Sequence, residues 1–201
     1  KDKVSWFANC TWSSRHYFNL HENRRMKVGL DIMAVSRARF VHSGKSCKVE
    51  DHFRIWSQPQ LIERLDGYRI GCYVSEGKSM GFGTGAYSDY NKFRRLLSYA
   101  VLGVDPKVVW DKFSDFKGKP FVELINMSDD EGAIGPLTSR KLAEDFSSLQ
   151  DSIEQKLRKA IEERDLQDFF GEQDVSWWLS RYARWLEAFT IASDSGFVIF
   201  H

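Results

Sequence analysis

Three glycines lie between a predicted strand and a predicted helix, and their position suits the binding of an anion. Gly81, Gly83 and Gly85 precede a helix that is expected to begin near Tyr87. Glycine lets the backbone approach a ligand closely, and the free N–H groups and dipole at a helix start favour negative charge. The sequence therefore predicts a phosphate-binding turn. The candidate ligand-binding residues are Gly83, Gly85, Tyr87, Ser88, Tyr90, Asn91, Arg94 and, from a second turn, Ser128.

A purely structural role for the same glycines is the alternative interpretation. They would form a bulged strand end, and Ser88 would cap the helix. The letters G-F-G-T-G-A also match a dinucleotide-binding pattern, but that pattern needs an acidic residue at the end of the next strand. Asp105 has about the right spacing, yet no strand precedes it. Dinucleotide binding is therefore not expected.

An acidic run over residues 128–131 follows a predicted strand and precedes a long predicted helix. Adjacent carboxylates repel one another, which raises a pKa for general acid–base work or attracts a hard cation such as Mg²⁺. Asp129 and Glu131 are the candidate catalytic residues, and Asp31 joins them as a candidate metal ligand. The alternative is a solvated acidic turn whose charge favours the start of the following helix. No cofactor beyond this Mg²⁺ hypothesis is indicated.

Large aromatic residues recur along a helix predicted over residues 175–192. Trp178, Tyr182, Trp185 and Phe189 follow helical spacing, which is typical of a stripe that faces the core. Trp177 falls off this stripe, so it is the candidate for contact with a partner protein. No Ser-His-Asp or Cys-His pattern is recognisable, and nucleophilic catalysis is not expected.

Charge and composition exclude several classes of protein. The 201 residues include 29 Lys and Arg against 28 Asp and Glu, so neither duplex nucleic acid nor an anionic membrane is an expected partner. No apolar run is long enough to span a membrane, and no export-signal pattern is present. Three separated cysteines without a C-x-x-C pair favour reduced thiols and a cytoplasmic location.

The first 25 residues differ from the rest of the chain. They carry a net charge of +3, whereas residues 26–201 carry −2. Their aromatic residues follow no clear period, and Met26 directly precedes a strand-like run. We therefore predict an N-terminal extension over residues 1–25, either an arm that docks on a partner or a non-native start, and a single domain over residues 26–201.

The candidate residues are expected to be positioned by alternating strands and helices. Strands are predicted over 27–36, 68–74, 79–84, 121–126 and 197–200, and helices over 87–102, 136–161 and 175–192. The strands at 68–74 and 79–84 are expected to form a hairpin, and the region 42–67 is expected to be loop with a short element at 53–56. The last strand is apolar on both faces, which predicts a central place in the sheet.

Together these elements predict an α+β fold. Its expected form is a single mixed or antiparallel sheet of about four to five strands, with two long helices and one shorter helix packed on it.

Several separated segments resemble a family of uncharacterised proteins encoded in bacterial and phage genomes. The resemblance rests on G-L-D-I at 29–32, G-C-Y-V at 71–74, G-A-Y-S-D-Y-N at 85–91, P-F-V-E-L-I-N-M-S-D-D-E-G-A-I-G-P at 120–136, and the closing W-L-E-A-F and G-F-V-I-F-H. Members of that family begin at the equivalent of Met26. The resemblance implies an intracellular microbial context and brings no established activity.

Three functional hypotheses follow from these patterns. The first is an intracellular protein that binds a compact anionic molecule, a nucleotide or a phosphorylated metabolite, between residues 81–91 and 128–135. The second is a phage or mobile-element protein that binds a host protein without catalysis. The third is a Mg²⁺-dependent hydrolase that uses the carboxylates of residues 129–131.

Overall fold

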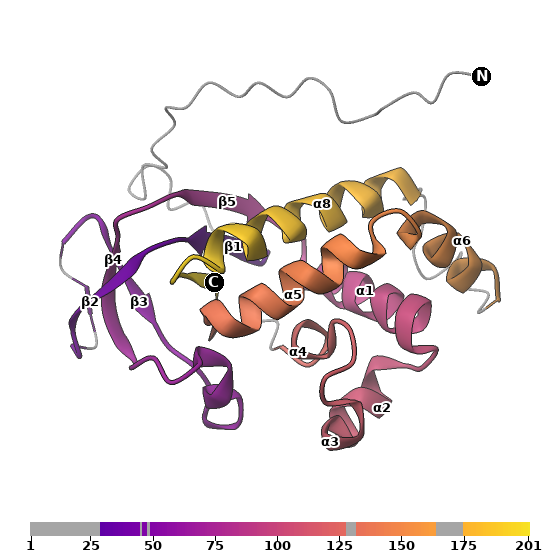
Figure 1. Cartoon of the computed structure of the whole chain (residues 1–201), viewed down its shortest axis with the longest axis horizontal. Helices are drawn as coiled ribbons and strands as arrows, with labels where there is room; N and C mark the ends of the chain where they lie inside the picture. Colours follow the sequence, from indigo (N-terminus) through magenta and orange to yellow (C-terminus); the bar gives the residue numbers. More distant parts are fainter. Residues whose placement is uncertain (1–28, 45, 48, 128–131, 164–174) are drawn as a thin grey trace.

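Two antiparallel β-sheets and a set of helices make up the residues that the computed structural model describes, which are 29–44, 46–47, 49–127, 132–163 and 175–201 (Figure 1). The larger sheet has the strand order β5-β1-β7-β6, and the smaller has the order β2-β4-β3. The strands are β1 Asp31–Val35, β2 Ala38–His42, β3 His52–Ile55, β4 Gly71–Ser75, β5 Ser79–Gly83, β6 Gly132–Ile134 and β7 Phe197–Phe200. The predicted α+β class is confirmed, although a second sheet accompanies the predicted one.

One bent two-stranded ribbon joins the two sheets. Val35 of β1 lies opposite Ser79 of β5 before the bend, and Ala38 of β2 lies opposite Ser75 of β4 after it. The hydroxyl of Ser36 accepts a backbone hydrogen bond across the bend at 2.7 Å. The predicted hairpin of residues 68–74 with 79–84 is therefore wrong. These segments instead continue one another around the bend, because β1 and β2 offer a partner to each.

The last strand, β7, occupies the centre of the larger sheet. It pairs with β1 on one side and with β6 on the other, and all of its residues are buried. The predicted central position is thus confirmed. Directly before β7, Gly196 lies so close to the backbone of Val35 and Ser36 that a side chain would not fit. Glycine therefore lets the chain pass beneath the sheet bend as it enters β7.

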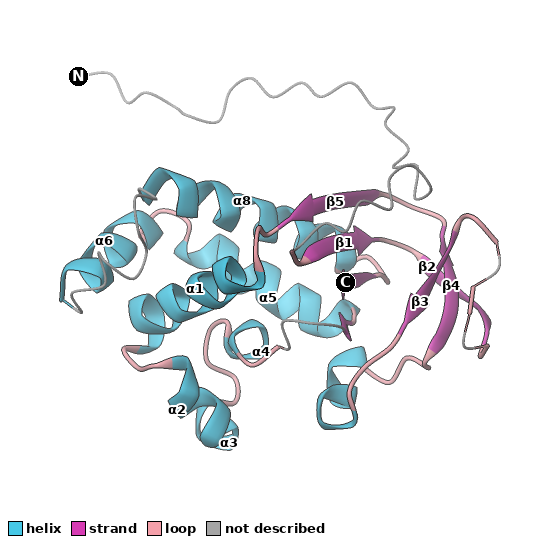
Figure 2. Ribbon diagram, turned by 180° about the vertical axis from the view of Figure 1, so that it is seen from behind, coloured by secondary structure: helices cyan, strands magenta, loops and turns pink. Residues whose placement is uncertain are grey.

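Helices cover one face of the larger sheet, and the smaller sheet lies on its other side (Figure 2). The helices are the 3₁₀ helix η1 Pro59–Leu65, α1 Tyr87–Leu97, the π-helical turn η2 Ser98–Leu102, α2 Pro106–Asp111, α3 Phe113–Phe116, α4 Val122–Ile125, α5 Pro136–Leu149, α6 Ile153–Glu163 and α8 Val175–Ala192. α8 contacts β1, β5 and β7, and α5 packs beside α8. Among the described helices, none is long and apolar enough to cross a membrane.

The main hydrophobic core lies between these helices and the larger sheet. The predicted aromatic stripe of α8 is buried in it, which confirms that Trp178, Tyr182, Trp185 and Phe189 are core residues. The Tyr182 hydroxyl donates a hydrogen bond to the Phe146 carbonyl of α5 at 2.6 Å, and the two rings meet edge to face. A phenol buried in this way keeps its polar group satisfied while its ring packs.

A second core fills the space between the two sheets. Val35, Phe197 and Ile199 on the larger sheet face Phe53 and Tyr73 on the smaller one. The far face of the larger sheet is therefore apolar as well. This explains why β7 does not alternate apolar and polar residues, as a strand with one solvent-exposed face does.

Two predicted elements differ from those observed. The predicted strand 121–126 is instead the short helix α4, because apolar residues at 121, 122, 124 and 125 also fit one helical turn. Phe121 precedes it with φ of 62°, and its N–H donates to the Asp145 carboxylate at 2.9 Å. The long helix predicted from Pro136 is divided into α5 and α6 by a turn at residues 150–152.

Cys47 and Cys72 form a disulfide that ties the loop after β2 to β4. The expectation of reduced thiols is therefore wrong for these two residues, and Cys10 lies outside the described residues. Spacing along the chain gave no sign of the pairing, because 25 positions separate the two residues and only the fold brings their Cα atoms to 5.6 Å. The predicted extension over residues 1–25 also lies outside the described residues.

Candidate functional site

The turn that leads into α1 is a closely bonded backbone junction. Gly83 ends β5, and its carbonyl accepts a hydrogen bond from the Arg181 guanidinium. Gly85 has φ of 93°, which favours glycine, and its carbonyl accepts a backbone hydrogen bond at 3.1 Å from the segment that precedes β1. The Asp89 carboxylate accepts a hydrogen bond from the Ala86 N–H at 3.1 Å. A carboxylate of the chain itself thus lies at the helix start where phosphate was predicted.

The predicted ligand-binding residues of α1 lie in different surroundings. Tyr87 and Ser88 are exposed in the first turn, and Asn91 is half-buried. Tyr90 is fully buried, and its hydroxyl donates to a carbonyl of α4 at 3.0 Å, so its side chain belongs to the core. Arg94, one turn further along, is buried too, but it lies against the segment that leads to the acidic run.

Gly132, the first described residue after the acidic run, and Gly83 of the glycine turn lie at the same end of the larger sheet but in its opposite edge strands. The predicted site residues Ser128, Asp129 and Glu131 lie outside the described residues. Gly132, directly after them, begins β6, whereas Gly83 ends β5, and β1 and β7 lie between these two edge strands. Three strand spacings of about 4.8 Å place the two edge strands about 14 Å apart.

The third predicted metal ligand, Asp31, begins β1. Its backbone exchanges two hydrogen bonds with His201, at 3.1 and 3.0 Å. Within the described part of the chain, no three His, Cys, Asp or Glu side chains converge to hold a metal ion. Since Asp129 and Glu131 are not among the described residues, the Mg²⁺ site stays a prediction.

Arg94 is the predicted site residue with the most elaborate surroundings. Its side chain is only 7% exposed, and its guanidinium donates to the Met127 carbonyl at 2.5 Å. The guanidinium carbon lies 4.7 Å from the ring centre of Trp110 and 5.2 Å from that of Tyr90. A guanidinium close to aromatic rings is attracted to their electron-rich faces and still presents a planar array of N–H donors.

A polar hollow of about 220 Å³ opens beside this guanidinium. We call it the Arg94 hollow; its lining residues are Gln58, Gln60, Leu61, Arg94, Trp110, Asn126 and Met127. They come from η1, α1, α2 and the end of α4, so four separate elements converge here. Among these lining residues, Arg94 alone carries a formal charge, and three side-chain amides add hydrogen-bond donors and acceptors to the wall.

A second buried arginine also bonds to the α4 segment. Arg64, on η1, is 6% exposed, and its guanidinium donates to the Glu123 carbonyl of α4. It also lies 5.3 Å from the ring centre of Phe113. Burial lowers the pKa of Arg64, and the neighbouring Glu123 carboxylate acts in the opposite direction. Both arginines thus hold the α4 segment, and both bring positive charge to this side of the molecule.

Asp105 attaches α2, which carries Trp110, to α1. Its carboxylate accepts hydrogen bonds from the Lys107 N–H at 2.9 Å and from the Tyr99 hydroxyl at 2.8 Å, and Arg95 pairs with it at 3.4 Å. Burial acts to raise the pKa of Asp105, but these hydrogen bonds and the Arg95 charge outweigh it and hold that pKa below its ordinary value.

The lowered pKa of Asp105 predicts a loss of stability on acidification. A carboxyl with a depressed folded-state pKa contributes stability above its unfolded pKa, and this contribution disappears as pH falls through the folded pKa. The free energy of unfolding, measured with urea, should therefore fall more for the wild type than for Asp105→Asn when the pH is lowered from about 5 to about 3. The asparagine variant keeps a capping side chain but has no carboxyl group to protonate. A difference between the two proteins that is the same at both pH values would contradict this account.

Sequence patterns missed most of the Arg94 hollow. Gln58 and Gln60 lie in a region expected to be loop, and Trp110 and Asn126 belong to short helices that no periodicity revealed. The Gln-Pro pair at 58 and 59 was the available signal, because proline is favoured in a first helical turn. The expected exposed aromatic, Trp177, is half-buried instead, with the Arg181 guanidinium 4.5 Å from its ring centre.

Comparisons of the chain with protein-family models, with curated proteins and with solved structures found no significant match. Functional inference for this chain therefore depends on the chemistry of its own residues.

Proposed function

We propose that the protein binds a compact anionic molecule, a nucleotide or a phosphorylated metabolite, in the Arg94 hollow. The observation that carries the proposal is the buried Arg94 guanidinium beside a hollow that has three side-chain amides in its wall. A guanidinium donates paired hydrogen bonds that match the oxygens of phosphate or carboxylate. Its attraction for an anion is stronger when the surroundings exclude water.

The size of the hollow supports a small ligand or one part of a larger ligand. Sites for drug-sized molecules usually measure about 300–1,000 Å³, and the Arg94 hollow of about 220 Å³ is smaller. It is large enough for a phosphate or pyrophosphate group. Trp110, which is 42% exposed, lies at its rim and offers an aromatic surface to an attached base.

Thermal unfolding in the presence of inorganic phosphate, pyrophosphate and nucleoside mono- and diphosphates tests the proposal. A ligand at 100 times its dissociation constant stabilises the folded protein by about 2.7 kcal/mol. For a chain of this size, that corresponds to a rise in melting temperature of about 5–11 °C. If no member of this panel raises the melting temperature, the proposal is wrong.

Two variants connect any observed binding to the Arg94 hollow. Arg94→Lys keeps the charge but loses the paired donors, and Asn126→Asp adds a negative charge with little change of shape. Arg94→Lys should weaken anion binding at least about tenfold, because a lost hydrogen bond to a charged group costs about 1.5–3 kcal/mol. Asn126→Asp should weaken it by a similar factor, because its carboxylate repels the anion. The exposed Arg158→Gln on α6 is the control and should bind as the wild type does. Unchanged affinity in Asn126→Asp would exclude this hollow as the site.

The Cys47–Cys72 disulfide weighs against the cytoplasmic location that the cysteine pattern favoured. Disulfides form and persist in oxidising compartments and are rare in the reducing cytosol of most organisms. Trapping thiols with an alkylating reagent at the moment of cell lysis, followed by mass spectrometry, would reveal the state of Cys47 and Cys72 in the cell.

A further inference from the structure

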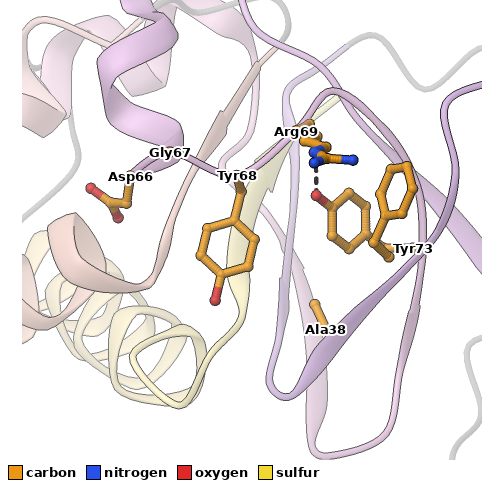
Figure 3. Close-up of a pocket in the computed structure, with 7 residues that line it drawn as sticks. Ala38, Asp66, Gly67, Tyr68, Arg69 and Tyr73 are labelled. Carbon is orange, nitrogen blue, oxygen red and sulfur yellow. Dashed lines mark hydrogen bonds between the residues drawn. The ribbon is translucent and has the colours of Figure 1, made fainter.

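A second, larger hollow lies at the smaller sheet (Figure 3). We call it the aromatic hollow; its volume is about 440 Å³, and its lining residues are Ala38, Phe40, Asp66, Gly67, Tyr68, Arg69 and Tyr73. They come from β2, β4 and the turn that follows η1. The volume falls within the range of about 300–1,000 Å³ that small-molecule sites occupy.

Three of the seven residues that line this hollow are aromatic. Phe40 lies directly opposite Tyr73 across the β2–β4 pair, with ring centres 5.4 Å apart and planes nearly perpendicular. Tyr68 and Tyr73 both meet the ring of Phe197 edge to face, at 5.2 and 5.1 Å. Edge-to-face packing is the arrangement that aromatic rings prefer, so a flat ring entering the hollow finds suitable neighbours.

The turn that forms one side of the hollow is fixed by its own hydrogen bonds. Asp66 and Gly67 both have positive φ, and the Asp66 carboxylate accepts hydrogen bonds at the start of α5 from the Leu137 N–H, the Thr138 N–H and the Thr138 hydroxyl, at 2.8–2.9 Å. The Tyr73 hydroxyl donates to the Arg69 carbonyl at 2.8 Å. The wall is therefore formed before any ligand arrives, which lowers the entropic cost of binding.

The charges at the rim favour an anion. The Asp66 carboxylate is engaged by three donors at the start of a helix, where the helix dipole stabilises negative charge. The Arg69 side chain is exposed, and no carboxylate pairs with it within the described residues. Its guanidinium is thus the charge available to a ligand, and carboxylate is a group that it binds with paired hydrogen bonds.

We propose that the aromatic hollow binds a small aromatic carboxylate, with the ring against Phe40 and Tyr68 and the carboxylate on Arg69. This inference does not depend on the Arg94 hollow, because the two hollows share no lining residue. The two sites also differ in chemistry, since one has a single buried guanidinium among amides and the other has an aromatic wall with an exposed guanidinium.

Titration of backbone amide NMR signals with phenylacetate tests the proposal, and 2-phenylethanol serves as the neutral ligand with the same ring. For a ligand with about ten heavy atoms we expect a dissociation constant on the order of 1 mM. Signals of Ala38, Gly67 and Arg69 should shift with phenylacetate, and 2-phenylethanol should bind at least about fivefold more weakly, because it lacks the charge-assisted hydrogen bonds. Equal affinity for the two ligands would overturn the carboxylate assignment, and shifts confined to other residues would overturn the site.

Variants separate the contributions of charge and space. Arg69→Gln should lower the affinity for phenylacetate to that for 2-phenylethanol, and it should leave the affinity for 2-phenylethanol unchanged. Arg54→Gln is the matched control, because Arg54 is exposed on β3 and does not line the hollow. Ala38→Phe should fill the hollow and abolish the shifts with both ligands. Retained phenylacetate binding in Arg69→Gln would contradict the proposal even if Ala38→Phe fails to fold.

Discussion

Replacing Trp185 by alanine should destabilise the protein by about 4 kcal/mol, near the middle of the range for large aromatic residues in a core. The Trp185 side chain is 1% exposed, and its ring lies within 6.2 Å, centre to centre, of five other rings on four elements. Those rings are Phe82 of β5, Tyr90 and Phe93 of α1, Phe189 of α8 and Phe200 of β7. Its removal leaves a cavity where helices and sheet meet, and neighbours fixed in separate elements cannot collapse to fill it.

Urea unfolding is the measurement for this prediction, since the midpoint and slope together give the free energy of unfolding. A loss of about 4 kcal/mol is a large part of the stability of about 5–15 kcal/mol that folded domains possess. Leu186→Ala on the same helix is the control, because Leu186 is only half-buried and should cost much less. A loss below about 1 kcal/mol for Trp185→Ala would show that this core is not packed as described.

Removing the Cys47–Cys72 disulfide should cost about 3.5 kcal/mol. The bond closes a loop across a separation of 25 residues, and the chain-entropy model assigns that stabilisation to the restriction of the unfolded chain. The described residues of the loop that contains Cys47 are exposed or half-buried and none belongs to either core, so core packing contributes little to holding this loop. Cys47→Ser removes the bond and keeps the buried Cys72 side chain in place, so no cavity is created at Cys72.

Reductant provides the control for the disulfide prediction. Adding dithiothreitol to the wild type should lower its stability to that of Cys47→Ser, whereas adding it to the variant should change nothing. If reductant leaves the urea midpoint of the wild type unchanged although mass spectrometry confirms free thiols, the disulfide makes no contribution to stability.

Local patterns were sufficient where the structure depends on one face of one element. The stripe of Trp178, Tyr182, Trp185 and Phe189 has helical spacing, and α8 buries all four residues. The apolar run at 197–200 belongs at the centre of a sheet, and β7 lies there. In both cases the apolar residues are consecutive or periodic along the chain, so their burial can be predicted from the sequence.

Short elements were not predictable in the same way. Residues 121–125 have an apolar content that fits either a strand or one helical turn, and the Asp145 carboxylate, 24 positions away, supplies the hydrogen bond at the start of α4. The smaller sheet was missed because β2 and β3 have four or five residues each and gain their partner, β4, only through the bend at Ser36.

The candidate site shows the same division. The sequence pointed to Arg94 because it lies on the predicted helix that follows the glycine turn, and to the acidic run because its carboxylates are adjacent in the chain. Both signals are contained in one segment. It placed the anion at the start of α1, where the Asp89 carboxylate lies instead. The convergence of Gln58, Trp110 and Asn126 on Arg94 joins four elements across more than 60 positions, and no local pattern records it.

By itself the sequence determined the α+β class, the buried face of α8 and the central place of β7. Only the tertiary structure decided the bend that makes two sheets, the Cys47–Cys72 pairing and the two hollows. The physical reason is the range of the interactions: periodic burial acts within one element, whereas disulfides, hollows and strand partners depend on distances between elements that the order of residues does not encode locally.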